Sequence, residues 1–381
     1  MSYALRKTLF LLLFAPLPFC CGKPGSEIPS PESPAAARAA APRPDHFPAR
    51  IWAAADFERL RKDVLWSGRS EQVNIPVYPG NTTALRAAMA ESRSGVLLLS
   101  ITASDYPRMG ASNRVYFRYF LRGTDALTVR LFNLDQNLSH SLKVSGLVQG
   151  SWSEATADFS AAEPDSAESG PIREGERMGG LTIMAETLGG QSGAELIVDD
   201  VICFSEKAGE GNSDNEPFPR RVILVRGFDP LEYYHPWTHT DYQVIQQGLK
   251  LENDWGVARG LESPGENLKR IRLIVDPPQA VGENTRLRFR GYCRQTARVQ
   301  AMIFDLTDSD NRHIVLGDLA PGLWQTVTLN FTREGVKNDG NQTEFSAGHR
   351  VDDLFFLVWP EKGGEAEMLI DDLVLYDAGE R

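Results

Sequence analysis

The sequence has few cysteines: only four occur in 381 residues, and two of them, Cys20 and Cys21, are adjacent near the N-terminus. The other two, Cys203 and Cys293, could form at most one disulfide, so disulfides are not expected to stabilise the folded body. Basic clusters are also missing after the N-terminal segment, and the formal net charge is −11. Nucleic acids are dense polyanions, so we expect no nucleic-acid partner.

Catalytic signatures and long apolar runs are absent as well. No Gly-x-Ser-x-Gly elbow, His-Glu-x-x-His pair or phosphate-binding loop occurs in the sequence. The apolar run at residues 8–19 is too short to span a bilayer, which requires roughly 20 apolar residues. Because Arg6 and Lys7 precede this run, residues 1–21 have the pattern of a signal peptide. We therefore expect an exported protein without a catalytic centre.

The end of this segment, Leu17-Pro-Phe-Cys20-Cys21, resembles the lipobox of bacterial lipoproteins. The resemblance implies that the chain is cleaved before Cys20 and that Cys20, acylated, becomes the mature N-terminus. Cys21 is the alternative. Such a protein would be attached to the membrane through its lipid, in the cell envelope, and would face the periplasm or the exterior. The alternatives are plain secretion and an uncleaved anchor.

Two stretches have the composition of linkers. Residues 22–50 are rich in Pro and Ala, and residues 206–220 in Gly, Asn and acidic residues, so neither is expected to bury enough apolar surface to form a core. The predicted organisation is a signal peptide over 1–21, a linker over 22–50, domain 1 over 51–205, a linker over 206–220 and domain 2 over 221–381.

The two predicted domains share a repeat with a constant spacing of 172 residues. This period is too long for a solenoid unit, so it indicates duplication of a whole domain. The matched segments are 115–118 (Val-Tyr-Phe-Arg) with 287–290 (Leu-Arg-Phe-Arg), 131–134 with 303–306, 150–152 (Gly-Ser-Trp) with 322–324 (Gly-Leu-Trp), Phe159 with Phe331, and 197–202 (Ile-Val-Asp-Asp-Val-Ile) with 369–374 (Leu-Ile-Asp-Asp-Leu-Val).

The matched segments have the character of β-strands. They are short, rich in β-branched and aromatic residues, and partly alternating, and turn-forming residues separate them. The sequence therefore predicts an all-β protein with two tandem β-sandwich domains of the jelly-roll type. Cys203 and Cys293 each align with a leucine in the other copy, so both should be buried as small apolar residues. Trp152 and Trp324 align with each other, and we expect both to belong to the cores; the alternative is that each is a platform on which a sugar ring stacks.

Each copy ends in a strand with an Asp pair, and each begins with an aromatic–acid pair, at Phe57-Glu58 and Phe228-Asp229. With the Gly-x-Trp segments, these features resemble the jelly-roll carbohydrate-binding modules of the galactose-binding-like superfamily. In that family, acids of the first and last strands commonly hold a calcium ion. The resemblance implies structural calcium held by Glu58 with Asp199 and by Asp229 with Asp371. The alternative is that these acids accept hydrogen bonds from the backbone or from arginines.

Domain 2 also has an aromatic cluster that domain 1 lacks. Its members are Tyr233, Tyr234, Trp237 and Trp255. They lie among turn-forming residues, where binding loops often occur, and several rings beside polar groups would suit a neutral sugar. The alternative is that they pack against the other domain or cover a sheet edge.

Three functions are compatible with these features. The first is a non-catalytic envelope lipoprotein that binds carbohydrate or a glycan-bearing partner. The second is a structural or protein-interaction role in the envelope without a sugar ligand. The third is a glycan-active enzyme, for which His239, Asp241 and Tyr242 are the only local group with suitable chemistry.

Overall fold

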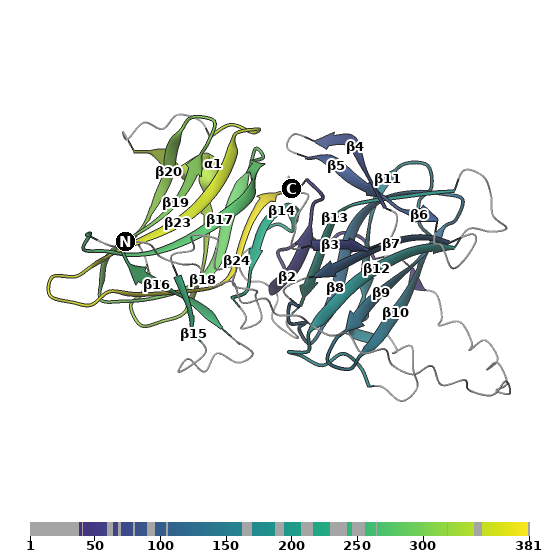
Figure 1. The fold of residues 1–381 in the computed structure, drawn as a ribbon, viewed down its shortest axis with the longest axis horizontal. Helices are drawn as coiled ribbons and strands as arrows, with labels where there is room; N and C mark the ends of the chain where they lie inside the picture. The colour runs from purple at the N-terminus through teal and green to yellow at the C-terminus, as the bar shows by residue number, and fades with distance from the viewer. Residues whose placement is uncertain are drawn as a thin grey trace, which may run out of the picture. The chain divides into compact units, whose positions relative to one another are not determined.

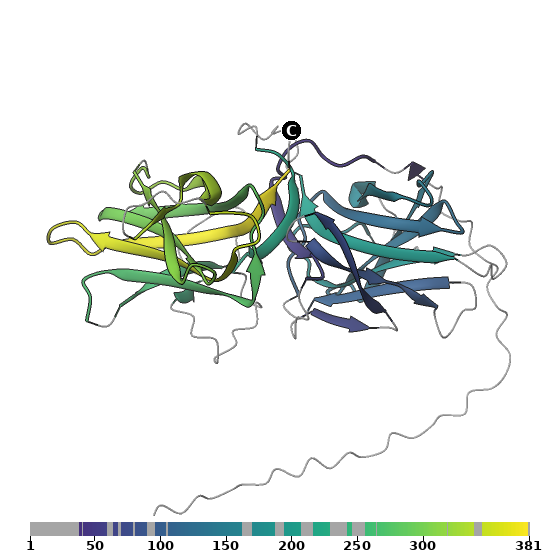
Figure 2. The ribbon, with the colours of Figure 1, turned by 90° about the horizontal axis from the view of Figure 1, so that it is seen from above.

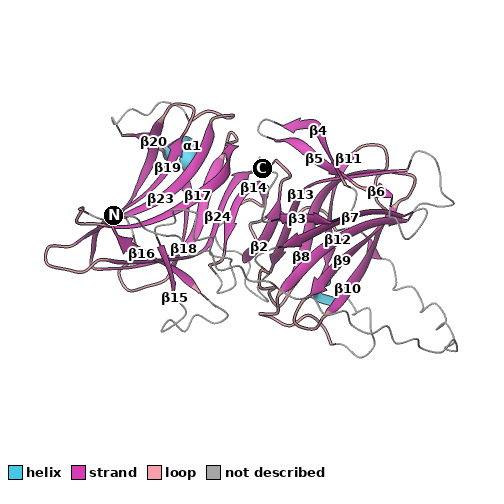
Figure 3. Cartoon of the chain, viewed as in Figure 1, coloured by secondary structure: helices cyan, strands magenta, loops and turns pink. Residues whose placement is uncertain are grey.

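The computed structural model is an all-β protein with two β-sandwiches in tandem, as the sequence predicts (Figures 1 and 3). Residues 35–381 belong to one compact unit. The structure describes residues 38–39, 41–58, 64–67, 70–78, 81–89, 96–103, 106–161, 170–186, 194–206, 216–228, 242–245, 256–263, 265–317, 319–338 and 345–379. No helix among these residues is both long enough and apolar enough to cross a membrane.

The first sandwich consists of two sheets. One has the strand order β1-β10-β9-β12-β7-β3 and the other β11-β8-β13-β5-β4, with β6 paired to β7 and β2 to β13. The strands are β1 (Arg38–Ala39), β2 (Arg50–Ala55), β3 (Val64–Ser67), β4 (Glu71–Tyr78), β5 (Asn81–Arg86), β6 (Ala88–Met89), β7 (Val96–Ala103), β8 (Asn113–Arg122), β9 (Ala126–Asn133), β10 (Leu138–Ser145), β11 (Trp152–Asp158), β12 (Met178–Glu186) and β13 (Glu195–Ser205), and one 3-10 turn, η1, covers Phe159–Ala161.

The second sandwich repeats this arrangement. Its strands follow the order β21-β18-β24-β16-β17-β23-β19-β20-β22. The pairing of β16 with β17 joins the two layers. In addition, β14 pairs with β24, and β15 pairs with β16. The elements are β14 (Pro219–Arg226), β15 (Tyr242–Ile245), β16 (Val257–Glu262), β17 (Lys269–Ala280), β18 (Thr285–Arg294), β19 (Thr296–Asp305), β20 (Asp310–Leu316), β21 (Gln325–Asn330), α1 (Phe331–Glu334), β22 (Val336–Lys337), β23 (Arg350–Pro360) and β24 (Glu367–Ala378).

The repeat extends to the pairing register. Ala155 lies opposite Phe117 in the first copy, and Val327 lies opposite Phe289 in the second, 172 positions further along in both strands. Alternate residues of β8 and β18, including Phe117 and Phe289, belong to the two cores. Figure 2 shows the strand layers of each sandwich. One ancestral sandwich therefore explains both copies.

The cysteine prediction is confirmed. Cys203 and Cys293 are both buried and unbonded to each other. Burial raises the pKa of the Cys203 thiol to about 12, because an apolar environment disfavours the thiolate. This thiol is therefore a packing group rather than a reactive one.

A third apolar cluster joins the two sandwiches, and it uses equivalent positions of both copies. Phe204 and Tyr376 are 172 residues apart, and Phe47 and Phe218 are 171 apart. The ring of Phe47 lies 5.0 Å from that of Tyr376, and the ring of Phe218 lies 5.3 Å from that of Phe204. Each leading segment therefore packs against the other copy. The buried members of this seam cluster are Phe47, Ile51, Tyr116, Ile202, Phe204, Phe218, Val222, Val374, Tyr376 and Ala378.

A buried ionic group lies next to the seam cluster. The side chain of Arg221 is fully buried and contacts Asp56 Oδ2 of the first copy at 3.2 Å and Asp377 Oδ2 of the second at 3.5 Å. It also donates hydrogen bonds to Gln279 Oε1 and to the Ala280 carbonyl. Residues from the stretches 41–50 and 216–221 thus contribute buried side chains, although the sequence assigns most of them to linkers.

Candidate functional site

The aromatic residues expected to bind sugar, Tyr233, Tyr234, Trp237 and Trp255, lie outside the described residues, so their role stays a prediction. The same is true of Cys20. Of the group weighed for catalysis, only Tyr242 is described, and its ring packs edge-on against Phe228 at 5.4 Å. This contact assigns Tyr242 a packing role at the start of β15.

The tryptophan prediction was wrong. Trp152 and Trp324 are only half-buried and do not belong to the cores between the layers. They lie on the opposite, outer face of the equivalent sheets, where Trp152 packs with Phe120 against a small separate apolar cluster. The expectation failed because alternation within a strand defines two faces but does not say which of them is covered.

In the first copy, Trp152 is part of a small set of outer-face side chains. The guanidinium carbon of Arg118 lies 5.6 Å from the centre of the Trp152 ring, and the Phe120 ring lies 6.2 Å from it. Arg118 Nη1 also contacts Asp200 Oδ2 at 3.0 Å, and its Nε lies 3.9 Å from Glu154 Oε1. We call Arg118, Phe120, Trp152 and Asp200 the Trp152 platform.

The second copy builds the same set from equivalent residues. The guanidinium carbon of Arg290 lies 5.4 Å from the centre of the Trp324 ring, and the Tyr292 ring lies 5.8 Å from it. Arg290 Nη1 is 3.4 Å from Asp372 Oδ2 and 3.6 Å from Asp371 Oδ2. We call Arg290, Tyr292, Trp324 and Asp372 the Trp324 platform; each member is 172 residues from its counterpart.

Strand pairing and a bulge position these side chains. Trp152 lies opposite Phe120 across the β11–β8 pair, which brings their outer-face side chains together. The β13 ladder shifts register between Asp199 and Ile202, and Asp200 takes a positive φ of 46°. Asp372 does the same in the second copy, with a φ of 45°. Because the bulge re-aims a carboxylate in both copies, Asp200 and Asp372 reach the arginine beside each tryptophan.

The platforms have the chemistry of a sugar site. A half-buried indole offers part of an apolar ring, while the neighbouring arginine and carboxylate offer hydrogen-bond donors and acceptors that could fix the orientation of hydroxyl groups. Arg118, Trp152 and Asp200 and their counterparts belong to segments whose sequences match between the copies. The sequence did not indicate that their side chains lie on the outer face of the sheet.

The acids predicted to hold calcium occupy different environments. Asp199 and Asp371 are completely buried, at equivalent positions of the last strands. The carboxylate of Glu58 accepts hydrogen bonds from the Thr82 amide at 2.5 Å and the Thr83 amide at 2.6 Å, and thus holds the start of β5. Asp229 lies outside the described residues. The calcium assignment stays a prediction.

A different group of residues could hold a metal. Ligand atoms of Asp305, Asp308 and His349 all lie within 4.8 Å of one another. The same carboxylates also bind cationic side chains, since Arg312 Nη2 is 2.6 Å and Lys337 Nζ 2.8 Å from Asp308 Oδ2. The hydrogen bond from Lys337 is the largest cause that holds the pKa of Asp308 below its usual value. An ion-pair network therefore accounts for this cluster without a metal.

No known protein family model matches the chain, and no curated protein matches it. Among solved structures, it is similar to the CBM22-1–CBM22-2 tandem domain of Paenibacillus barcinonensis Xyn10C, with 12% identity, a TM-score of 0.30, and coverage of 91% of this chain and 100% of that one. It is also similar to TmCBM61 in complex with beta-1,4-galactotriose, with 13% identity, a TM-score of 0.25, and coverage of 38% and 90%. A third similarity is to the CBM22-1–GH10 modules of Clostridium thermocellum xylanase 10B with xylohexaose, at 11% identity, a TM-score of 0.28, and coverage of 43% of this chain but only 30% of that one. These similarities concern the fold and carry no information about the ligand.

Proposed function

We propose that this protein is a non-catalytic carbohydrate-binding protein of the cell envelope, whose two sandwiches each present a tryptophan platform to a glycan. One observation carries the proposal: both copies place a half-buried tryptophan beside a second aromatic ring and an arginine on the outer face of equivalent sheets. Duplicated domains diverge freely on solvated faces, so a shared polar–aromatic set on an outer face favours a shared ligand.

The proposed location in the cell envelope rests on the predicted signal peptide, residues 1–21. Acylation of Cys20 would attach the chain to a membrane, and the residues that follow would separate the sandwiches from it. Labelling with a fatty-acid analogue in a bacterial host should mark the wild type and not the Cys20→Ser variant; equal labelling of both would exclude Cys20 as the lipid site.

Replacing a platform tryptophan by alanine is expected to weaken glycan binding. Loss of the stacking surface at Trp152 or Trp324 should raise the Kd about tenfold for each variant, equivalent to roughly 1.4 kcal/mol. The double variant should show no measurable binding. Affinity electrophoresis against xylan, galactan and mixed-linkage glucan would measure this.

Trp359 is the matched control for these variants. It lies on β23, in the other sheet of the second copy, is half-buried, and has the guanidinium carbon of Arg298 5.0 Å from its ring centre. Trp359→Ala should therefore bind as the wild type does. If all three single variants bind equally, or if no glycan binds the wild type, the second candidate function, docking of an envelope protein, is favoured instead.

Calcium is proposed as a structural ion in each copy, held in part by Asp199 and Asp371. Full burial of a carboxylate is costly without a compensating cation, and calcium takes hard oxygen ligands in flexible geometry. Glu58 and Asp229 are the predicted partners at the opening of each copy. In the chelated protein, these acids would depend on nearby arginines such as Arg290, which lies 3.6 Å from Asp371.

Calcium at about one hundred times its Kd is expected to raise the melting temperature by about 5 °C, because a ligand that binds only the folded state stabilises it. Chelator should reverse the shift, and magnesium at the same concentration should produce a smaller one. Differential scanning fluorimetry of the wild type and of Asp371→Asn would show this, with a reduced shift in the variant. An unchanged melting temperature under calcium and under chelator would exclude the ion.

A further inference from the structure

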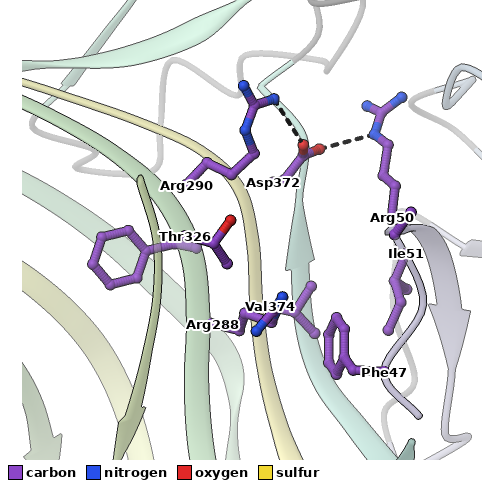
Figure 4. Close-up of a pocket in the computed structure, with 10 residues that line it drawn as sticks. Phe47, Arg50, Ile51, Arg288, Arg290, Thr326, Asp372 and Val374 are labelled. Carbon is purple, nitrogen blue, oxygen red and sulfur yellow. Dashed lines mark hydrogen bonds and ion pairs between the residues drawn. The ribbon is translucent and has the colours of Figure 1, made fainter. Parts of the chain in front are cut away.

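A pocket opens beside the Trp324 platform, where the segment before β2 reaches the outer face of the second sandwich (Figure 4). Its lining includes Phe47 and Arg50 of the first copy and Arg288, Arg290 and Asp372 of the second. Arg50 and Arg290 point toward the Asp372 carboxylate from opposite sides: Arg50 Nε is 2.9 Å from Asp372 Oδ1, and Arg290 Nη1 is 3.4 Å from Oδ2. Two guanidinium groups therefore contact one carboxylate, and a third, that of Arg288, lies in the same pocket with its carbon 4.9 Å from the centre of the Phe47 ring.

The corresponding surface of the first copy has the opposite charge balance. Arg118 lies between two carboxylates there, those of Asp200 at 3.0 Å and Glu154 at 3.9 Å. The position next to it on the same face of β8 is Tyr116, whose ring belongs to the seam cluster. One arginine thus meets two acids on this face.

Three changes reverse this balance in the second copy. The equivalent positions are Tyr116 and Arg288, Arg118 and Arg290, Glu154 and Thr326, and Asp200 and Asp372. The exposed Thr326 lies opposite Arg290, where the first copy has Glu154 opposite Arg118, so this acid is missing from the second copy. Arg288 adds a cation at the position of Tyr116. Arg50, with 19% of its side chain exposed, adds another from the first copy. The surface of the second copy therefore has three arginines, Arg50, Arg288 and Arg290, with the two acids Asp371 and Asp372. The first copy has one arginine, Arg118, with the two acids Glu154 and Asp200.

The charged group of Arg290 lies beside the aromatic ring of Trp324. The guanidinium carbon of Arg290 is 5.4 Å from the centre of the Trp324 ring, and 31% of the Arg290 side chain is exposed. Thr326 is two residues after Trp324 and projects from the same face of that edge of the sheet. A sugar stacked on Trp324 would therefore place a substituent near Arg290 and Thr326.

We infer that the Trp324 platform, with Arg50 and Arg288, prefers glycans that carry a carboxylate on the sugar ring, that is, uronate-bearing polysaccharides, over neutral ones, whereas the Trp152 platform has no such preference. Guanidinium groups match carboxylates in geometry and charge. A protein with a net charge of −11 does not attract polyanions in general, so the selection is local. This inference rests on the proposed carbohydrate-binding function and specifies its ligand.

The test compares each acidic polysaccharide with its own carboxyl-reduced form. Glucuronoxylan and polygalacturonate, before and after reduction, are titrated into the full chain at low salt. The wild type should bind at least one native polymer about tenfold more tightly than its reduced form, and added salt should diminish this difference. Trp152→Ala should leave the preference intact, because the preference belongs to the second copy.

The decisive variant is Thr326→Glu, which gives the second copy the acid of the first. A glutamate is tolerated opposite the arginine at the equivalent position of the first copy, so the fold should be retained. The variant should lose the preference for native over reduced polymer, while binding of neutral xylan stays unchanged. Val315→Glu adds the same charge at a position on β20 that is 48% exposed, and should keep the preference.

Two results would overturn the inference in distinguishable ways. If native and reduced polymers bind equally and Thr326→Glu has no effect, acid selection is wrong but the proposed carbohydrate-binding function stands. If no polysaccharide binds, acidic or neutral, both fail together.

Discussion

Replacing Arg221 by methionine is expected to lower the free energy of unfolding by about 3–5 kcal/mol, because it leaves two buried carboxylates without their cation. Asp56 and Asp377 are only 6% and 4% exposed. Asp377 is further held by a hydrogen bond from the Gly282 amide at 2.9 Å and by a contact with the Thr285 hydroxyl. Neutral donors satisfy a carboxylate in part but do not balance its charge. Urea unfolding followed by tryptophan fluorescence measures the loss.

The difference in unfolding free energy between Arg221→Met and the wild type should become smaller at acidic pH. Burial raises the pKa of Asp377 above its usual value, and Arg221 opposes that shift. Without Arg221, the pKa of Asp377 in the folded state rises further. A carboxyl group whose pKa is higher in the folded state contributes stability that is present below its unfolded pKa and lost as the pH rises through its folded pKa. Arg221→Met should therefore be closer to wild type at pH 5 than at pH 8.

Arg294→Met is the matched control, since the Arg294 side chain is 58% exposed and pairs with Glu367 at 3.1 Å. A pair with one solvent-exposed partner of this kind contributes less than about 1 kcal/mol. Adding Asp377→Asn to Arg221→Met should restore part of the lost stability, because the amide carries no charge. If Arg221→Met unfolds at the wild-type urea concentration, the ionic group beside the seam has no net stabilising role.

The second large effect is expected at the seam cluster. The wild type should unfold in a single calorimetric transition although it contains two sandwiches, because the seam cluster couples them. Phe218→Ala should divide that transition in two and cost about 3–5 kcal/mol. Phe218 is 1% exposed and packs its ring against Phe204 at 5.3 Å and Tyr116 at 5.1 Å. The alanine would remove the main contact between its leading segment and the first copy.

Phe331→Ala is the control for coupling. Phe331 is completely buried, and it belongs to the second core and not to the seam cluster. This variant should lose similar stability but still unfold in one transition, at a lower temperature. Two transitions already present in the wild type would show that the seam does not couple the sandwiches.

Several features could be predicted from particular residues. The matches between 115–118 and 287–290 and between 197–202 and 369–374 correspond to β8 with β18 and β13 with β24, at the centres of equivalent sheets. The leucines aligned with Cys203 and Cys293 correctly indicated burial. These inferences succeed because period-two alternation and duplication are properties of the local sequence.

The candidate site could be predicted only in part. Arg118 and Trp152 were among the matched segments, but Trp152 was assigned to the core. The outer face of β8 carries large apolar residues too, namely Tyr116 in the seam cluster and Phe120 beside Trp152. A strand with apolar residues on both faces gives no indication of which side is interior.

By itself, the sequence determined that this chain is a duplicated all-β protein, since the alternation, the turns and the constant spacing are written along the chain. Only the tertiary structure decided which face each tryptophan occupies, that Arg221 neutralises Asp56 across 165 residues of sequence, and that Arg50 completes a pocket on the other copy. The reason is physical. Strand character follows from neighbours in sequence, whereas burial, charge pairing and pocket formation depend on which surfaces meet when the sheets pack.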